Sequence, residues 1–346
     1  VLANLATGNP VVVKPHPGCV LPMARMVQIG REVLSDAGLD PNALTLALDH
    51  PESRVGKSLL SDPRTAIVDF TGGAEFGGWI EENCRHLLVY TETAGCNSVL
   101  LESCEALEPV LKAIAHSLCI FSSQMCTAAQ NIFVPADGVK TAKGRVSCAD
   151  VVARLTDEID RLTADESVAA ALCGAIMSER TVEEIAAFEV QGEHVGKVLR
   201  HSEAFTNPEF PNARTRTPSL VAVDAEETVY RKEYFGPMGF VIRCQSPEHG
   251  LLRATEDAKE HGAIASYAYS IDPEFQEEII EAHGNAGASV GINLIRQLPI
   301  NYTAAFSDFH VTGLNPAGTA CLSDPAFVAS RFRITQSKTE LPAEES

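Results

Sequence analysis

Short continuous apolar runs alternate along this chain with longer stretches whose apolar residues recur at the helical period. Residues 10–13 form the first β-branched run, residues 22–37 form an amphipathic stretch that ends before a glycine, and residues 44–48 form a second apolar run. This order predicts a strand, a helix and a strand, which together make a βαβ unit. A continuous β-branched run is typical of a parallel sheet that is covered on both faces. The pattern therefore indicates an α/β fold.

The same alternation continues through the rest of the chain. It predicts further strands over residues 66–70, 87–91, 98–102, 132–134 and 240–244, and helices over residues 106–120, 149–163 and 275–283. In the helix over residues 149–163 we expect Leu155, Ile159 and Leu162 to form the buried stripe. Residues 180–218 contain several prolines and two histidines, and we interpret them as a surface loop on the substrate side. Their spacings fit no metal site, and we predict none.

Composition narrows the possible partners. The chain has 346 residues, ten cysteines and a formal net charge of −19. An acidic surface repels nucleic-acid phosphates and anionic lipid, so we expect neither nucleic acid nor membrane as a partner. The cysteines form no Cys-x-x-Cys pair, which favours free thiols in a reducing cytoplasm. The chain starts at Val1 inside an apolar helical pattern, and we expect it to be a fragment or a processed chain.

One cysteine is distinguished by its position. Cys126 follows the predicted helix over residues 106–120 and a turn of small residues, and it precedes the strand over residues 132–134. A thiol at such a junction can meet a helix end and a substrate, conditions that lower a cysteine pKa and make the sulfur nucleophilic. A buried free cysteine is more often a small hydrophobic residue, so this position alone does not establish catalysis.

A carboxylate strengthens the case for Cys126. Glu92 directly follows the strand over residues 87–91 and lies 34 residues before Cys126. A glutamate at a strand end, beside a nucleophilic thiol, suits a general base that activates water against a thioester. The two residues therefore predict covalent catalysis, with Cys126 as the nucleophile and Glu92 as the base.

These two segments resemble the aldehyde dehydrogenase superfamily. Its base motif, Glu-Leu-Gly-Gly, appears here as Glu-Thr-Ala-Gly from Glu92, and its nucleophile motif, Gly-Gln-x-Cys, appears as Ser-Gln-Met-Cys ending at Cys126. The resemblance implies the fold of that family. Residues 1–92 would be part of a Rossmann-type cofactor domain with a parallel sheet, residues 93–322 an α/β catalytic domain, and residues 323–346 an oligomerisation tail. It also implies NAD(P)-dependent oxidation of an aldehyde to an acid by a homodimer or tetramer.

The resemblance assigns a lysine to the cofactor. Gly-Asn-Pro-Val-Val-Val-Lys-Pro, with Lys14 as its lysine, nearly repeats a family signature whose lysine contacts the adenosine ribose or its phosphate. Three residues later, NAD-preferring members usually carry a glutamate that binds both ribose hydroxyls, whereas this chain has Pro17. Without that carboxylate a 2′-phosphate is not repelled, so we expect NADP in preference to NAD. We add His16 as a hypothetical second contact.

Two further motifs imply cofactor contacts. The glycine-rich turn after residues 66–70 opens a predicted helix, and backbone amides at a helix N-terminus suit a pyrophosphate. It matches the family's Phe-Thr-Gly-Ser-x-Glu-x-Gly and supplies Gly72, Gly73 and Gly77, with Gly73 in place of the serine. In the family's Glu-x-Phe-Gly-Pro motif, here from Glu233, the glutamate binds the nicotinamide ribose and the phenylalanine, here Phe235, lies against the ring.

A competing nucleophile has to be weighed. Residues 287–291 read Gly-Ala-Ser-Val-Gly and match the Gly-x-Ser-x-Gly elbow of hydrolases. An elbow requires a strand before the serine and a helix after it. Here a helical pattern precedes Ser289 and an apolar run follows it, so we disfavour this serine.

Beyond residue 293 the chain departs from the common family pattern. Residues 304–310 and residues 330–336 resemble the phenylacetate-degradation branch called PaaN, which implies a CoA-linked semialdehyde as the substrate. The resemblance places the family's second oxyanion donor, an asparagine, upstream of Val1. Two alternatives remain open: a catalytically silent scaffold of the same fold, and a CoA-acylating dehydrogenase. Glu92 argues against the second, because CoA-acylating branches generally lack this base.

Overall fold

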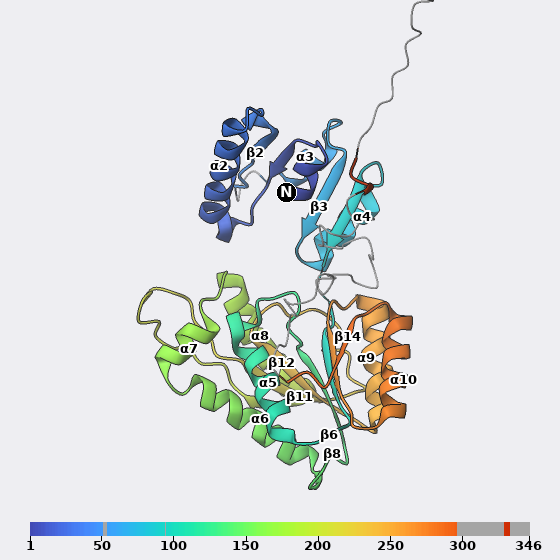
Figure 1. The fold of residues 1–346 in the computed structure, drawn as a ribbon. Coiled ribbons are helices and arrows are strands. Elements are labelled where there is room, and N and C mark those ends of the chain that lie inside the picture. Colours follow the sequence, from blue (N-terminus) through green and yellow to red (C-terminus); the bar gives the residue numbers. More distant parts are fainter. Residues whose placement is uncertain (51–53, 94, 296–328, 333–346) are drawn as a thin grey trace, which may run out of the picture. The chain divides into compact units, whose positions relative to one another are not determined.

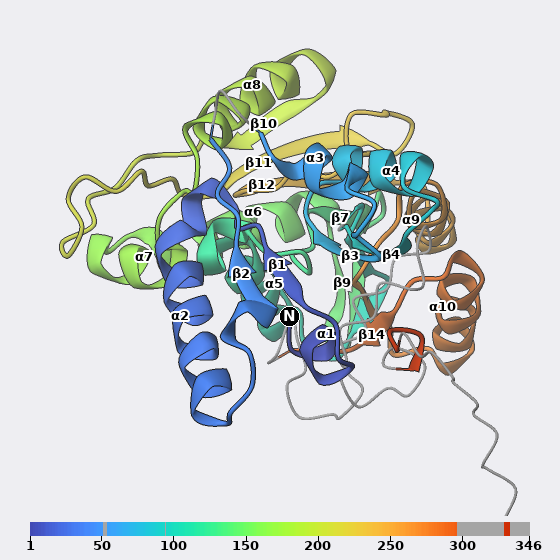
Figure 2. The same ribbon diagram turned by 90° about the horizontal axis from the view of Figure 1, so that it is seen from above.

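The chain is described by a computed structural model over residues 1–50, 54–93, 95–295 and 329–332. It divides into two compact units: residues 1–68, 86–88 and 321–346 make the first, and residues 69–85 and 89–320 make the second. Figures 1 and 2 show the helices and strands of both units, many of them with labels. Residues 304–310, on which the PaaN resemblance rests, lie outside the described residues, as does most of the tail.

The first unit is built on a parallel pair of strands. β1 (Val11–Val13) and β2 (Leu44–Leu46) are connected by α2 (Val20–Asp36), so the predicted βαβ unit is confirmed. Val13, Val27 and Leu44 form its buried core. Val12 points away from that core and is 53% exposed. Within the described part of the chain, the expected cover on both faces of β1 is therefore not found, because α2 packs on one face only.

Several short elements accompany this pair. They are α1 (Leu2–Ala6), α3 (Gly56–Ser61) and the 3-10 turns η1 (Pro17–Cys19) and η2 (Pro41–Ala43). β3 (Ile67–Thr71) and β4 (Leu88–Glu92) pair with each other, and α4 (Ala74–Asn83) lies between them in the sequence. Both strands, and the helix after the glycine-rich turn, were predicted from the sequence.

A seven-stranded sheet organises the second unit. Its strands, in spatial order, are β10 (Lys197–Arg200), β11 (Ser219–Asp224), β12 (Met238–Cys244), β7 (Asn131–Pro135), β5 (Ser98–Leu101), β13 (Ser266–Tyr269) and β14 (Val290–Ile292). β10 is antiparallel to β11, and all other neighbouring pairs are parallel. A small sheet of β6 (Ser103–Cys104), β8 (Val139–Thr141) and β9 (Gly144–Val146) accompanies it.

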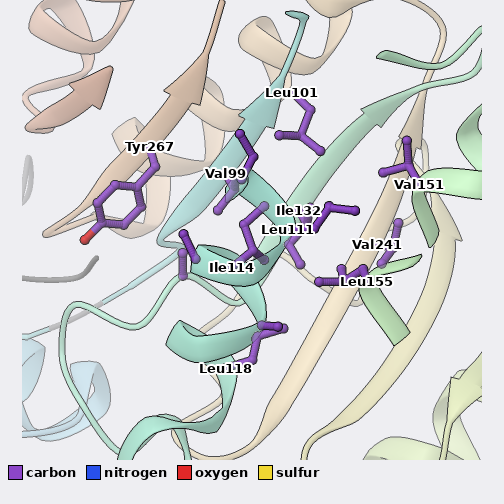
Figure 3. Packing of buried hydrophobic residues seen from close by; sticks show 14 of the residues in the cluster. Val99, Leu101, Leu111, Ile114, Leu118, Ile132, Val151, Leu155, Val241 and Tyr267 are labelled. Atoms are coloured by element: carbon purple, nitrogen blue, oxygen red, sulfur yellow. The ribbon is translucent and has the colours of Figure 1, made fainter. Parts of the chain in front are cut away.

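Both faces of the large sheet are buried, which explains its continuous apolar strands. Val99 and Leu101 of β5 belong to the core on one face, with α5 (Leu107–Cys119) and α6 (Cys148–Thr163), as Figure 3 shows. Leu100 belongs to the core on the other face, with α8 (Glu179–Val195), α9 (Pro247–His261) and α10 (Pro273–Ala286). On α6, two residues of the expected stripe, Leu155 and Ile159, are fully buried, and Leu162 is partly buried.

The interpretation of residues 180–218 as a loop is wrong over its first half. α7 (Glu166–Cys173) is followed by α8, which begins after the N-cap Ser178, whose side chain accepts a hydrogen bond from the Thr181 amide. Ile185 and Phe188 lie three residues apart and are buried against the sheet, which is the spacing of a helix face. The prolines that suggested a loop occur only from residue 208 onward. The histidines therefore lie on or near regular elements.

Two expectations remain: one on the hydrolase elbow at Ser289 and one on the membrane. Ser289 follows α10 and precedes β14, so the order is helix then strand and the hydrolase elbow is not formed. Among the helices of the described ranges, none combines the length and apolar character needed to cross a membrane.

Candidate functional site

The segment around Cys126, residues 120–130, is here called the nucleophile loop. It starts at the C-terminal end of α5 with Phe121, Ser122 and Ser123, whose φ angles of 51°, 54° and 50° are all left-handed. Such a conformation costs on the order of 1–3 kcal/mol for a residue other than glycine. Two hydroxyl groups offset part of this cost: Ser123 donates to the Leu118 carbonyl at 2.8 Å, and Ser122 donates to the Cys173 carbonyl at 3.0 Å. The turn brings the chain from α5 to Cys126.

Gln124 fixes the loop to the segment between α7 and α8. Its side-chain amide donates to the Ala175 carbonyl at 2.9 Å, and its side-chain oxygen accepts from the Met177 amide at 2.8 Å. Gln124 is the glutamine of the predicted nucleophile motif. Its observed contacts are structural: they hold the backbone two residues before Cys126.

Asn97, directly before β5, anchors the loop from the other side. Its side-chain amide donates to the Cys126 carbonyl at 2.7 Å and to the Ala128 carbonyl at 3.1 Å. Its oxygen accepts from the Ile264 and Ala265 amides, both at 3.0 Å. Both amide hydrogens and both oxygen lone pairs of this 2% exposed side chain are used. Asn97 therefore links Cys126 to the start of β5 and to the segment before β13.

The structure brings Cys126 and Glu92 together. The Glu92 carboxylate lies close enough to the Cys126 thiol to affect its pKa. Burial first, then the negative charges of Glu92 and Glu233, raise the pKa of Cys126 to about 12, although its own backbone amide acts in the opposite direction. The expected lowering of the cysteine pKa is therefore wrong for this state. The helix before Cys126 presents its C-terminus, which does not stabilise a thiolate, and the neighbouring charges are negative.

Backbone contacts around glycines fix Glu92 at the end of β4. The Gly72 amide donates to the Glu92 carbonyl at 3.1 Å. A Cβ at Gly77 would lie 2.5 Å from the Thr93 side chain, and a Cβ at Gly95 would lie 2.2 Å from the Gly262 carbonyl oxygen. Gly95 also has a φ of +142°, so only glycine fits there. The glycine-rich turn and the base motif are thus held against each other by a backbone hydrogen bond and by close packing.

Glu233 and Phe235 lie beside the nucleophile loop. They line a cavity together with residues of that loop and of the base motif; the lining residues are Gly95, Asn97, Ser123, Met125, Ala128, Gln130, Glu233, Tyr234, Phe235 and Gly236. Burial raises the pKa of Glu233 to about 7. Phe235 is 44% exposed, which leaves its ring available to a ligand.

Lys14, Pro17 and His16 belong to the first unit. The Lys14 ammonium forms an ion pair with Asp49 at 3.0 Å, and Lys14 holds the pKa of that carboxyl below its usual value. Pro17 begins η1, and the His16 ring caps this turn by accepting a hydrogen bond from the Gly18 amide at 3.1 Å. Of the predicted cofactor residues, the structure groups Glu233 and Phe235 with Cys126, and Gly72 and Gly77 with the Glu92 strand.

Sequence reasoning missed the side chains that hold this arrangement. Asn97, Gln124 and Gln130 are polar residues in or beside the two recognised motifs, and no role was predicted for them. A polar amide flanked by residues of a buried strand is the only signal that Asn97 offered. Asp49 follows β2 by three residues, and its proximity to Lys14 depends on the parallel pairing of Val13 with Leu46.

Together these features define an α/β protein in which the Cys126 thiol and the Glu92 carboxylate lie close together, and a second carboxylate, Glu233, lines a small cavity beside the nucleophile loop. The chain belongs to the aldehyde dehydrogenase family, whose sequence profile matches residues 1–307. The fold predicted from the sequence is confirmed.

Individual relatives agree with this family. The chain is 25% identical over 259 residues to 1-pyrroline-5-carboxylate dehydrogenase 1 of Halalkalibacterium halodurans, covering 72% of this chain and 47% of that protein. The crystal structure of an NAD-dependent aldehyde dehydrogenase from Burkholderia multivorans is 42% identical, with a TM-score of 0.89 over 97% of this chain and 60% of that one. The NADP complex of the NADP-dependent glyceraldehyde-3-phosphate dehydrogenase from Bacillus halodurans shares the fold, with a TM-score of 0.66, 21% identity and coverage of 85% and 57%. The chain spans about half the length of the curated relative.

Proposed function

We propose that the full-length protein oxidises an aldehyde to a carboxylic acid with NAD(P), using Cys126 as the nucleophile and Glu92 as the base. The observation that supports this most directly is the nearness of the Glu92 carboxylate to the Cys126 thiol, whose pKa this carboxylate raises. It gives the thiol proton an acceptor at the moment of attack. Glu233 and the exposed Phe235 lie beside the nucleophile loop and are the groups offered to a ligand there, because the cavity that they line has a volume of only about 10 Å³.

Each proton in this mechanism has a named acceptor. The Cys126 proton passes to Glu92 as the sulfur bonds to the aldehyde carbon, which explains how a thiol of raised pKa can react. The Cys126 backbone amide can donate to the developing oxyanion. When bound, the nicotinamide cofactor would accept the hydride that leaves this carbon. After Glu92 has released the first proton to solvent, it takes a proton from the water that attacks the thioester carbon. The bond between this carbon and the Cys126 sulfur then breaks, the acid leaves, and Glu92 returns its proton to the sulfur.

The residues present fit such a cofactor. Gly73 is the N-cap of α4, and a Cβ at this position would meet no atom within 4 Å, so the space above the first helical amides is open. Those amides have no partner within the helix and suit a pyrophosphate. The glutamate at 233 and the exposed phenylalanine at 235 would hold the nicotinamide ribose and ring, as the family motif implies. Lys14 would contact the adenosine ribose or its phosphate.

The choice between NADP and NAD depends on Lys14 and its acidic partner. Pro17 leaves a 2′-phosphate unopposed, which favours NADP, but the Asp49 carboxylate 3.0 Å from the Lys14 ammonium supplies a negative charge that opposes it. Asp49→Asn removes the charge and keeps the shape. We expect NADP to bind roughly tenfold more tightly in this variant, with NAD binding little changed. NADP affinity is measured by titration calorimetry on the full-length parent and on the Asp49→Asn variant. Equal affinities would show that Asp49 does not set the preference between NADP and NAD.

The substrate proposal is a CoA-linked semialdehyde formed in phenylacetate breakdown. It is supported by the resemblance of residues 304–310 and 330–336 to the PaaN branch, and by sequence alone. The match to a 1-pyrroline-5-carboxylate dehydrogenase suggests a different small semialdehyde. The rates of NAD(P) reduction on a panel that contains both kinds of aldehyde therefore rank the two substrate candidates. Assembly as a homodimer or tetramer in the cytoplasm is part of the same proposal.

Cofactor reduction on this panel, with and without Cys126→Ala, tests the proposed function. We expect NAD(P) reduction by the parent and a loss of at least roughly 10³-fold in the variant, while the cofactor still binds. Cys19→Ala is the matched control, because Cys19 is another partly buried free cysteine. A parent that binds the cofactor but reduces none of it would be the silent scaffold. Product formation that requires CoA would identify an acylating dehydrogenase instead.

A further inference from the structure

Gln130 lies at the end of the nucleophile loop, directly before β7, and its side chain is 5% exposed. Its amide donates to the Lys232 carbonyl at 2.7 Å, and its oxygen accepts from the Tyr234 amide at 2.8 Å. These two groups are the backbone carbonyl and amide on either side of Glu233. One buried side chain therefore holds both flanks of the residue that lines the cavity.

The side chain of Tyr234, directly after Glu233, is also held: it donates to the Val229 carbonyl at 3.0 Å and packs edge-on against Phe188 and Phe240. The remaining contacts lie further from Glu233. Tyr230 donates its hydroxyl to the Ala225 carbonyl, and Arg231 forms ion pairs with Asp257 and Glu260. Asn131, the neighbour of Gln130, donates to the Tyr230 carbonyl at 3.1 Å. These contacts fix the beginning of the segment, two or three residues before Glu233.

Gln130 is also tied to the sheet, so it is a rigid support. Its backbone carbonyl accepts from the Phe240 amide of β12 at 2.7 Å. β12 pairs with β7, which begins at the next residue. Within the described chain, no residue donates a hydrogen bond to the Glu233 carboxylate or forms an ion pair with it. The position of this partly buried carboxylate is therefore set mainly by its backbone.

We propose that Gln130 is a positioning residue that holds the Glu233 carboxylate in the cavity beside Cys126. This inference rests on the proposed function for the cofactor role of Glu233, but not for the geometry. Without the two Gln130 hydrogen bonds, the backbone on both sides of Glu233 is restrained only through the Tyr234 side chain, and the carboxylate turns more easily toward water, where it is better solvated. Cofactor binding and the electrostatic environment of Cys126 would change together.

The test compares two isosteric variants of neighbouring buried amides. Gln130→Met removes both hydrogen bonds to the flanks of Glu233, and Asn131→Leu removes one hydrogen bond to the same segment at Tyr230. The first readout is the pH dependence of iodoacetamide alkylation of Cys126, which needs neither cofactor nor turnover. Glu92 is unchanged in all variants, so only the contribution of Glu233 differs.

We expect Gln130→Met to shift the alkylation profile to lower pH, in the direction of Glu233→Gln, because the Glu233 charge raises the pKa of Cys126. The double variant with Glu233→Gln should show no further shift, whereas Asn131→Leu should leave the profile in place. Additive shifts in the double variant, or equal shifts in Gln130→Met and Asn131→Leu, would overturn the proposal.

The second readout is cofactor affinity in the full-length protein, measured by titration calorimetry. If Glu233 contacts the cofactor, Gln130→Met should weaken binding by roughly tenfold and raise the cofactor KM more than it lowers kcat. This effect should also disappear in the Glu233→Gln background. An alkylation shift without any cofactor binding would leave Gln130 as the support of Glu233 and refute the proposed dehydrogenase function. The two failures are therefore distinguishable.

Discussion

The nucleophile loop and the strand pair that carries Lys14 differ in how their functional side chains are held. Cys126 is fixed by buried amides: Asn97 alone makes four hydrogen bonds around it. Lys14 and its partner Asp49 lie at the edge of a two-stranded pair, with side-chain exposures of 33% and 13%. The sheet beside Cys126 is buried on both faces and holds its side chains rigidly, whereas the strand pair that carries Lys14 has one covered face and holds its side chains by contacts at the surface. The difference predicts that substitutions near Cys126 have larger effects than equivalent substitutions near Lys14.

Asn97→Ala tests this comparison most strongly. The variant loses four buried hydrogen bonds and leaves two carbonyls and two amides without partners, so we expect a loss of roughly 3–5 kcal/mol in the free energy of unfolding. Asn42→Ala is the control in the first unit. Asn42 accepts one exposed hydrogen bond from Arg31, and its loss should cost less than about 0.5 kcal/mol. Urea unfolding measures both, and comparable losses would remove the distinction between the two regions.

Two carboxylates, Glu233 without an ion-pair partner in the described chain and Asp49 paired with Lys14, should respond oppositely to pH. Burial raises the pKa of Glu233 to about 7, so the folded state binds this proton more tightly than the unfolded state. Its contribution to stability is therefore greatest below about pH 4 and is lost as the pH rises through 7. Glu233→Gln should be more stable than the parent at pH 8, by about 2–3 kcal/mol relative to the difference at pH 4. Exposed Glu248→Gln provides the control.

Asp49 behaves in the reverse sense. Lys14 lowers the pKa of Asp49, so the stabilisation is present at neutral pH and is lost as the pH falls through the folded-state pKa. Asp49→Asn should therefore be less stable than the parent at pH 7, and the difference should vanish in acid. Urea midpoints at pH 3 to 8 distinguish the two patterns. If the stability differences of Glu233→Gln and Asp49→Asn from the parent changed with pH in the same direction, the raised pKa of Glu233 and the lowered pKa of Asp49 could not both be right.

A smaller effect concerns the reactivity of the thiols. The Glu92 charge raises the pKa of Cys126, so Glu92→Gln should speed alkylation of Cys126 at pH 8 on the order of tenfold. Cys19 of the first unit is the internal reference, and its rate should not change. Peptide mass spectrometry after iodoacetamide treatment reads both sites in one sample. An unchanged Cys126 rate would mean that Glu92 does not face the thiol.

The sequence was sufficient for most elements because the large sheet is buried on both faces and its strands are continuous apolar runs. Cys126 and Glu92 were found because each lies at a junction between elements inside a recognisable motif. Asn97 and Gln130 were not found, since their partners are backbone groups more than 25 residues away and leave no local pattern. The raised pKa of Cys126 was missed for a similar reason. It depends first on burial, which the sequence does not show, then on the charge of Glu92, and last on Glu233, 107 residues later in the chain.

The smallest effect concerns two left-handed residues, one in each region. Ser123 has a φ of 50° and Gly38, after α2, has a φ of +70°. Ser123→Gly should relieve about 1 kcal/mol of backbone strain and lose about the same from the hydrogen bond to the Leu118 carbonyl, so stability should change by less than about 1 kcal/mol. Gly38→Ser meets no atom within 4 Å but gains strain without such a bond, so it should cost about 1 kcal/mol. If Ser123→Gly instead destabilises the protein more than Gly38→Ser does, the Ser123 hydroxyl holds the nucleophile loop more strongly than one hydrogen bond explains.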